Sequence, residues 1–123
     1  MTGLPSPPAL LGTVAEPTRL RILNCLVAAP LFVSDLQAIL GLPQPTVSRH
    51  LRILRSAGVV RDTPIGPFVL YRLRPGSDPG ARMLRSILEA MTHHEGFHRE
   101  RASAKGRSRQ HAMMRTRNEA VMP

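Results

Sequence analysis

The stretch SDLQAILGLPQPTVSRHLRILRSAGVV, residues 34–60, decides the fold of this chain. Ser34 is a favoured N-cap for a first short helix, DLQAIL, which we expect to end at Gly41. A second helix is predicted to begin near Gln44 or Pro45 and to end at Ala57, with Gly58 as its cap. Two helices joined by a few residues, with a glycine in the turn, predict a helix-turn-helix.

The second helix has two different faces. On a helical wheel, Val47, Leu51 and Leu54 form an apolar stripe, which must pack on the first helix and the core. The opposite arc is polar and basic, and it carries Thr46, Arg49, Arg52 and Ser56, with Ser48 at its edge. A DNA-recognition helix needs this division, because one face reaches the DNA while the other anchors the helix.

Gln44 and Arg49 are the residues that we expect to read bases. A glutamine amide can pair in bidentate fashion with adenine, and a guanidinium group can do so with guanine. Pro45 removes one free N–H group at the helix start, and the remaining N–H groups still favour a phosphate. The alternative is that Ser48 and His50 line a solvated helix face with a half-buried ring. We favour DNA recognition, because the next segments have the pattern of a wing.

The segments around the helix-turn-helix complete a known plan. Two β segments, VVRDTP and FVLYRLR, follow it and are joined by the turn PIGP. A short helix through Leu10, Leu11 and Val14, a helix in EPTRLRILNCLVAAP and a short extended segment LFV precede it, and a helix starts from Pro79. The predicted fold class is mainly α with a small β-hairpin, a winged helix-turn-helix in the order α-α-β-α-α-β-β-α.

We expect one domain with a tail at each end. Residues 1–8 are Pro-rich and predicted to be flexible, and residues 9–95 form the DNA-binding and dimerisation domain. The apolar stripe ends after His98, so residues 96–123 are predicted to be a basic, disordered tail. The last predicted helix displays an apolar stripe that a second copy should cover, which predicts a homodimer. Its residues are Leu84, Ile87, Leu88 and Met91.

Composition limits the possible partners and compartment. The 123 residues carry 17 Lys and Arg, all but one of them Arg, and a net charge of +9. Such a charge suits a polyanion, although basic proteins also bind membranes or acidic proteins. The single cysteine, Cys25, excludes an intrachain disulfide and a cysteine-cluster metal site. Because no signal-peptide pattern and no apolar run of ~18 residues is present, we expect a cytoplasmic protein with no membrane partner.

Three stretches resemble the ArsR/SmtB transcriptional repressors in order and spacing: AEPTRLRILNCL, VSDLQAILGLPQPTVSRHLRILRSAGVV and VLYRL. The resemblance covers roughly residues 10–74. It implies a cytoplasmic homodimer that represses its operator, with the fourth helix in the major groove of double-stranded DNA and the hairpin near the minor groove. The matching DNA-reading positions are Gln44, Thr46, Ser48, Arg49 and His50, and the basic residues around the hairpin, expected to contact phosphate, are Arg61, Arg72 and Arg74.

The same resemblance raises the question of metal sensing. Metal-sensing members carry the motif CVCDL at the third helix, whereas this chain has FVSDL, with Phe32 and Ser34 at the cysteine positions. Neither side chain replaces a thiolate for a soft metal, so we expect no metal there and no cofactor. His94 and His98 are four residues apart and could share a metal on one helix face. Gly96 weakens a helix at this point, and we favour a polar helix end.

The sequence therefore predicts a DNA-binding transcriptional regulator. We expect an autoregulatory repressor that acts as a homodimer on a palindromic operator. An enzyme is not expected, because Ser48 and His50 have no third catalytic partner and the chain has no Gly-rich phosphate loop. The alternative is a basic winged-helix module that binds RNA or a protein partner through its tail. An operator-binding protein should discriminate DNA sequences at fixed salt, whereas a tail-driven one should not.

Overall fold

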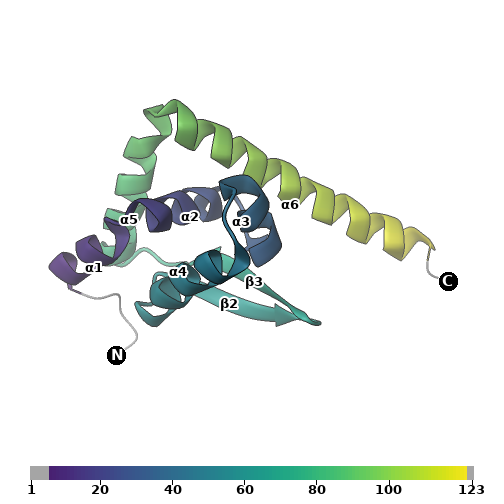
Figure 1. Cartoon of the computed structure of the whole chain (residues 1–123), viewed down its shortest axis with the longest axis horizontal. Helices are drawn as coiled ribbons and strands as arrows, with labels where there is room; N and C mark the ends of the chain where they lie inside the picture. The colour runs from purple at the N-terminus through teal and green to yellow at the C-terminus, as the bar shows by residue number, and fades with distance from the viewer. Residues whose placement is uncertain (1–5, 122–123) are drawn as a thin grey trace.

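The computed structural model describes the backbone of residues 6–121 and the side chains of residues 6–114 (Figure 1). In chain order the elements are α1 (Pro7–Val14), α2 (Pro17–Ala28), β1 (Leu31–Phe32), α3 (Val33–Leu40), α4 (Gln44–Ser56), β2 (Val60–Ile65), β3 (Phe68–Leu73), α5 (Pro79–Ala90), the 3-10 helix η1 (Met91–His93) and α6 (Glu95–Val121). The predicted winged helix-turn-helix is confirmed, with η1 and α6 added at its end.

Helices α3 and α4 form the helix-turn-helix. Gly41 closes α3 in the left-handed region at φ 69°, a conformation that glycine adopts without steric cost. The prediction that Ser34 caps α3 was wrong, because the helix already begins at Val33. Instead the Asp35 carboxylate accepts a hydrogen bond of 2.9 Å from the backbone N–H of Phe32. This acid near the helix start also suits the positive end of the helix dipole.

The three strands form one antiparallel sheet in the order β1-β3-β2. Strands β2 and β3 are the wing, and their register runs from Val60 opposite Leu73 to Ile65 opposite Phe68. Gly66, at φ 59°, supplies the left-handed residue at the wing tip. Pairing of Leu31 with Tyr71 adds β1 to the other edge of β3 and joins the wing to the helix-turn-helix.

The core lies between α2, α4, α5 and the sheet. The stripe predicted for α4 is confirmed, since Val47, Leu51 and Leu54 are each 0% exposed. Burying side chains of this size contributes about 1.5–3 kcal/mol each. This packing fixes α4 by its inner face and leaves its other face at the surface.

Helix α5 differs from its prediction. Leu84 and Leu88 are buried in the core of the single chain, and only Ile87 and Met91 are partly exposed. The expectation of a fully exposed apolar stripe was therefore wrong for two of its four residues. A small domain needs these leucines for its own core, because it has few other large apolar side chains to bury.

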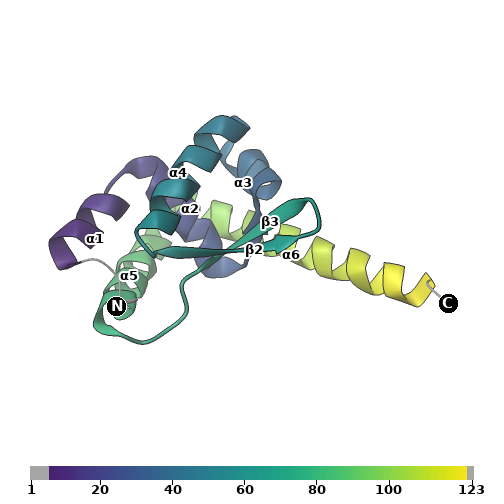
Figure 2. The same cartoon turned by 90° about the horizontal axis from the view of Figure 1, so that it is seen from below.

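The predicted disordered tail is also wrong over its described part, which forms the long helix α6. This helix turns back after η1, passes over α2 and α3, and then extends beyond the body of the molecule (Figures 1 and 2). At the other end, α1 already begins at Pro7, inside the segment predicted to be flexible. Residues 1–5 lie outside the described residues.

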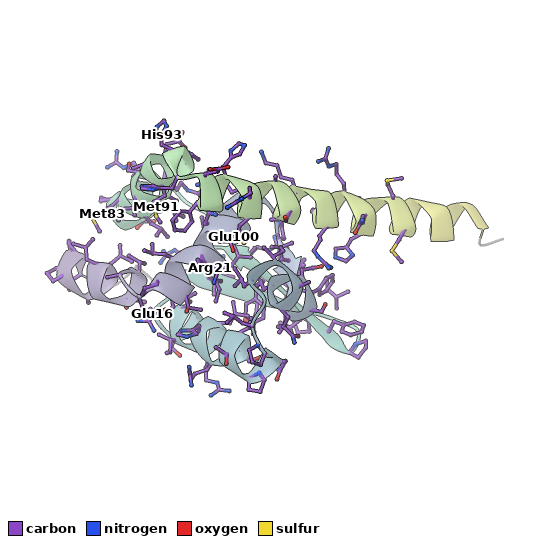
Figure 3. The ribbon with its side chains drawn as sticks, turned by 45° about the horizontal axis from the view of Figure 1, so that its top comes forward. Glu16, Arg21, Met83, Met91, His93 and Glu100 are labelled. Carbon is purple, nitrogen blue, oxygen red and sulfur yellow. The ribbon has the colours of Figure 1, made fainter. Side chains whose placement is uncertain are left out.

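Polar contacts hold the first half of α6 on α2. Arg21 and Glu100 form an ion pair of 2.6 Å between the two helices, as Figure 3 shows. Asn24, fully buried, donates to the carbonyl of Phe97 at 2.9 Å and accepts from Nε of Arg101 at 2.7 Å. Ala104 is the one apolar side chain of α6 that is buried, within residues 95–114. Helix α6 therefore lacks the apolar stripe from which a packed helix can be predicted in a sequence.

A buried carboxylate holds the next turns of α6 on α3. Asp35, whose side chain is 1% exposed, lies 3.1 Å from Nη1 of Arg107 and 2.9 Å from Nε2 of His111. Together with the N–H of Phe32, these donors satisfy both carboxylate oxygens. A buried charge persists only with such partners, so Asp35 ties the helix-turn-helix to α6.

Candidate nucleic-acid interface

The outer face of α4 holds most of the predicted DNA-reading residues. Gln44, Arg49 and Arg52 are exposed, and Thr46 and Ser48 are partly exposed. Gln44 Nε2 donates to Ser48 Oγ at 2.7 Å, which orders the first turn. Among the described residues, no side chain pairs with the guanidinium group of Arg49 or Arg52. Two free guanidinium groups on one helix face are available to a polyanion.

His50 does not belong to this face, and its predicted role in DNA reading was wrong. The residue is 7% exposed, and its Nδ1 lies 3.7 Å from Glu16, too far for a hydrogen bond. Burial lowers the pKa of His50, assisted by the charges of Arg19 and Arg49, although Glu16 acts in the opposite direction. The imidazole therefore packs between α4 and the start of α2 instead of facing outward.

The wing carries a cationic pair. Arg61 on β2 and Arg72 on β3 lie directly opposite each other in the register, and both are exposed. Like charges placed across a strand pair destabilise a sheet. An anion such as a phosphate would remove this repulsion, so the pair is a suitable place for the DNA backbone.

Arg74 lies in a different environment from Arg61 and Arg72. Its side chain is 12% exposed, with Nη2 3.9 Å from the Asp78 carboxylate, and its carbonyl accepts a hydrogen bond from Arg85. The prediction that Arg74 contacts phosphate is therefore not supported by its position, since a neighbouring acid and the surrounding chain cover it. Its place just after β3 ties the wing to the start of α5.

Sequence reasoning missed two features of the interface region. An ion pair of 3.0 Å between Arg55 and Asp62 joins the end of α4 to β2, and only the spacing of opposite charges in the sequence signals it. The wing tip is apolar, with Ile65 40% and Phe68 64% exposed. The uncharged turn PIGP was visible in the sequence, but the exposure of the flanking side chains was not.

Comparison with known proteins gives a consistent result. Residues 16–62 match the family of bacterial regulatory proteins called arsR. Over 88 residues the chain is 40% identical to the arsenic resistance transcriptional regulator ArsR1 of Pseudomonas putida, an alignment that covers 69% of this chain and 68% of that protein. The chain belongs to the ArsR family.

Further relatives support this assignment. The HTH-type transcriptional repressor SmtB of Mycobacterium tuberculosis is 38% identical over 84 residues, which are 68% of this chain and 58% of that protein. The crystal structure of the transcriptional repressor BigR from Xylella fastidiosa superposes with a TM-score of 0.62 at 28% identity, covering 72% of this chain and 85% of that one. Like the family, the chain is a DNA-binding transcriptional regulator and not an enzyme.

Two places in this ArsR-family chain are candidates for a metal site, the third-helix position and the pair His94 and His98. At the third-helix position, the Phe32 ring meets the rings of Phe68 and His111 edge-on, at centroid distances of 6.2 and 5.4 Å, while Ser34 is exposed. His94 precedes the first residue of α6 and His98 lies inside that helix, so the two do not lie together on one helix face, the arrangement that a shared metal would need. The described residues contain no group of three or more His, Cys, Asp or Glu side chains placed to hold a metal ion.

The described part of this ArsR-family chain also has no helix both long and apolar enough to span a bilayer. Its longest helix, α6, is rich in arginine and carries few apolar side chains.

Proposed function

We propose that this chain represses transcription in the cytoplasm as a homodimer bound to a palindromic operator, with autoregulation of its own gene. The observation that carries the proposal is the outer face of α4, where Arg49 and Arg52 are exposed and unpaired within residues 6–114, together with the exposed cationic pair of the wing. Helix α4 enters the major groove, and the wing follows the adjacent backbone.

Different residues have different tasks in this complex. Gln44 and Arg49 read base edges, and Thr46, Ser48 and Arg52 contact the groove edges and backbone. Gln44 must first give up its hydrogen bond to Ser48, which also places both side chains at the groove-facing helix start. Arg61 and Arg72 contact phosphates and so contribute to affinity without sequence preference.

The homodimer uses the partly exposed apolar residues at the end of α5 and the exposed Leu11 of α1. Ile87, Met83 and Met91 pack against the core only on one side, and Figure 3 shows Met83 and Met91 together at the α5 end of the molecule. Leu11 is 47% exposed. A second copy that covers these side chains places two α4 helices ~34 Å apart, one turn of DNA. Light scattering at micromolar concentration should give twice the mass of the chain, and a monomeric mass would contradict the dimer.

Binding-site selection from random double-stranded DNA tests the proposal directly. The purified chain should enrich a palindrome, and Arg49→Ala should weaken binding to it by about 1–3 kcal/mol while binding to random DNA changes little. Arg72→Ala is the matched control, because it should weaken binding to both DNAs and lower the slope of log affinity against log salt by roughly one unit. Equal effects of the two variants on selected and random DNA would refute this division.

A further inference from the structure

A cleft lies between the wing, β1 and α6. Its volume is about 240 Å³, and its lining includes Pro30, Phe32, Ile65, Leu70, Ser108 and His111. The apolar walls come from β1 and the wing, and the polar side chains come from α6. Three elements that are distant in the sequence therefore meet around one space.

The size and walls of the cleft suit one aromatic ring. An apolar cavity of roughly 150 Å³ already accepts benzene, so 240 Å³ leaves room for one ring with a small substituent. The Phe32 ring meets the rings of Phe68 and His111 at interplanar angles of 70° and 90°. Edge-to-face packing of this kind extends favourably to a further ring.

The polar side of the cleft selects a hydroxyl group. His111 Nε2 lies 2.9 and 3.0 Å from the two oxygens of Asp35, a carboxylate that accepts, so Nε2 carries the proton. The other ring nitrogen, Nδ1, has no hydrogen-bond partner among the described residues. The Ser108 hydroxyl, three residues earlier on α6, has no hydrogen-bond partner among the described residues. A ligand hydroxyl can form hydrogen bonds with both His111 and Ser108.

We propose that this cleft binds a small single-ring phenol, with the ring between Phe32, Ile65 and Leu70 and the hydroxyl at Ser108 and His111. Asp35 holds His111 in place from behind, with Arg107 as a second donor to the same carboxylate. The polar groups that set the hydroxyl preference are thus ordered before the ligand arrives, which reduces the entropy lost on binding.

Calorimetric titration of the full chain with phenol itself tests the proposal. We expect saturable binding at millimolar phenol, and binding of toluene, which has the same size and no hydroxyl, about 25-fold weaker, as expected for the loss of two neutral hydrogen bonds at about fivefold each. His111→Phe keeps an aromatic ring beside Phe32 and should weaken phenol about fivefold without changing toluene. Non-saturable phenol uptake, or equal affinities for phenol and toluene, would overturn the proposal.

A filled cleft provides the second test. Ser108→Leu places a larger apolar side chain in the cleft and should abolish the binding of both probes. Ser103→Leu is the matched control, because Ser103 lies on the exposed side of the same helix and its replacement should leave both affinities unchanged. Circular dichroism identifies variants that have lost their fold. Phenol binding that survives in a folded Ser108→Leu would place the ligand elsewhere and refute the assignment.

Discussion

Helices α4 and α6 are both rich in arginine, but two arginines of α6 face the core, whereas those of α4 face outward. In α4, apolar side chains such as Leu51 point inward, while Arg49 and Arg52 point outward and are unpaired within the described residues. In α6, Arg101 and Arg107 point inward and bind Asn24 and Asp35. Net charge counts these arginines equally. Because Arg101 and Arg107 are engaged inside the fold, the +9 of the chain overstates the charge offered to DNA.

Removing the apolar anchor of α4 should have the largest effect. Leu51→Ala leaves a cavity beneath a side chain that is 0% exposed, and we expect it to lower the free energy of unfolding by about 2–5 kcal/mol. Urea unfolding followed by circular dichroism measures the change. Arg52→Ala, the next residue on the exposed face, should change stability by less than about 0.5 kcal/mol. Similar losses in the two variants would contradict the two-faced description of α4.

Removing Asp35, the polar anchor of α6, should have the second largest effect on stability. Asp35→Asn removes the charge shared by Arg107 and His111, and we expect a loss of about 1.5–3 kcal/mol, because a hydrogen bond to a charged group contributes this much. Limited proteolysis should cut α6 faster in this variant. Asp62→Asn, which breaks the exposed pair with Arg55, is the control and should cost no more than about 1 kcal/mol. An Asp35→Asn protein as stable as the control would show that α6 does not depend on this carboxylate.

Replacing arginine by lysine sharpens the comparison further. Arg101 donates from Nε to Asn24 and from Nη2 to the carbonyl of Leu88, and a single ammonium group does not reproduce this fork. Arg101→Lys should therefore lower the free energy of unfolding by about 1 kcal/mol. Arg52→Lys on α4 should leave it unchanged. Thermal unfolding of Arg101→Lys and Arg52→Lys measures this difference, and equal stabilities of the two variants would contradict it.

The smallest effect should come from pH. Because burial lowers the pKa of His50, the folded chain binds fewer protons there than the unfolded chain between the lowered pKa and the ordinary value near 6.5. The contribution of His50 to stability is thus complete above 6.5 and is lost as the pH falls through that range. Urea unfolding at pH 7.5 and 5.5 should show a smaller loss in His50→Gln than in the natural chain. Equal losses of stability in His50→Gln and in the natural chain would contradict a lowered pKa of His50.

Glu16 does not interfere in that range. Burial alone would raise the pKa of Glu16, but hydrogen bonds from the N–H groups of Arg19 and Thr18, together with the charge of His50, outweigh it and lower the pKa. A lowered carboxyl pKa contributes stability above the ordinary value of 4.5 and loses it only below, as the pH falls through the folded value. The titration of Glu16 therefore does not affect the His50 measurement at pH 5.5.

The contrast between α4 and α6 also explains which parts of the fold could be predicted from the sequence. The helix-turn-helix and the wing follow from apolar periodicity and turn residues, which are visible in any single sequence. Helix α6 does not, because a helix held by Glu100, Arg101 and Arg107 has the composition of a disordered basic tail. A polar Asn24 inside the apolar helix RLRILNCL was the one hint that something polar packs above α2.

Within the interface, prediction succeeded where side-chain direction follows from the helical wheel. Arg49 and Arg52 are exposed as expected, whereas His50 lies close to the boundary between the two faces and is buried. The burial of His50 depends on the start of α2 covering this part of α4, a tertiary contact that spacing within α4 does not encode. Arg74 differs from Arg72 for a similar reason, because Asp78 and Arg85 reach it from the loop and from α5.

The single thiol offers a direct measure of how often this fold opens. Cys25 is 0% exposed beneath α6, and burial, with the charge of Glu100, raises its pKa to about 12. A thiol reagent reacts with the thiolate, so it should modify this side chain only in molecules whose α2 has lost its cover. The rate at which the reagent labels Cys25 at neutral pH therefore measures how often α6 detaches. Mass spectrometry can follow this labelling without any engineered residue.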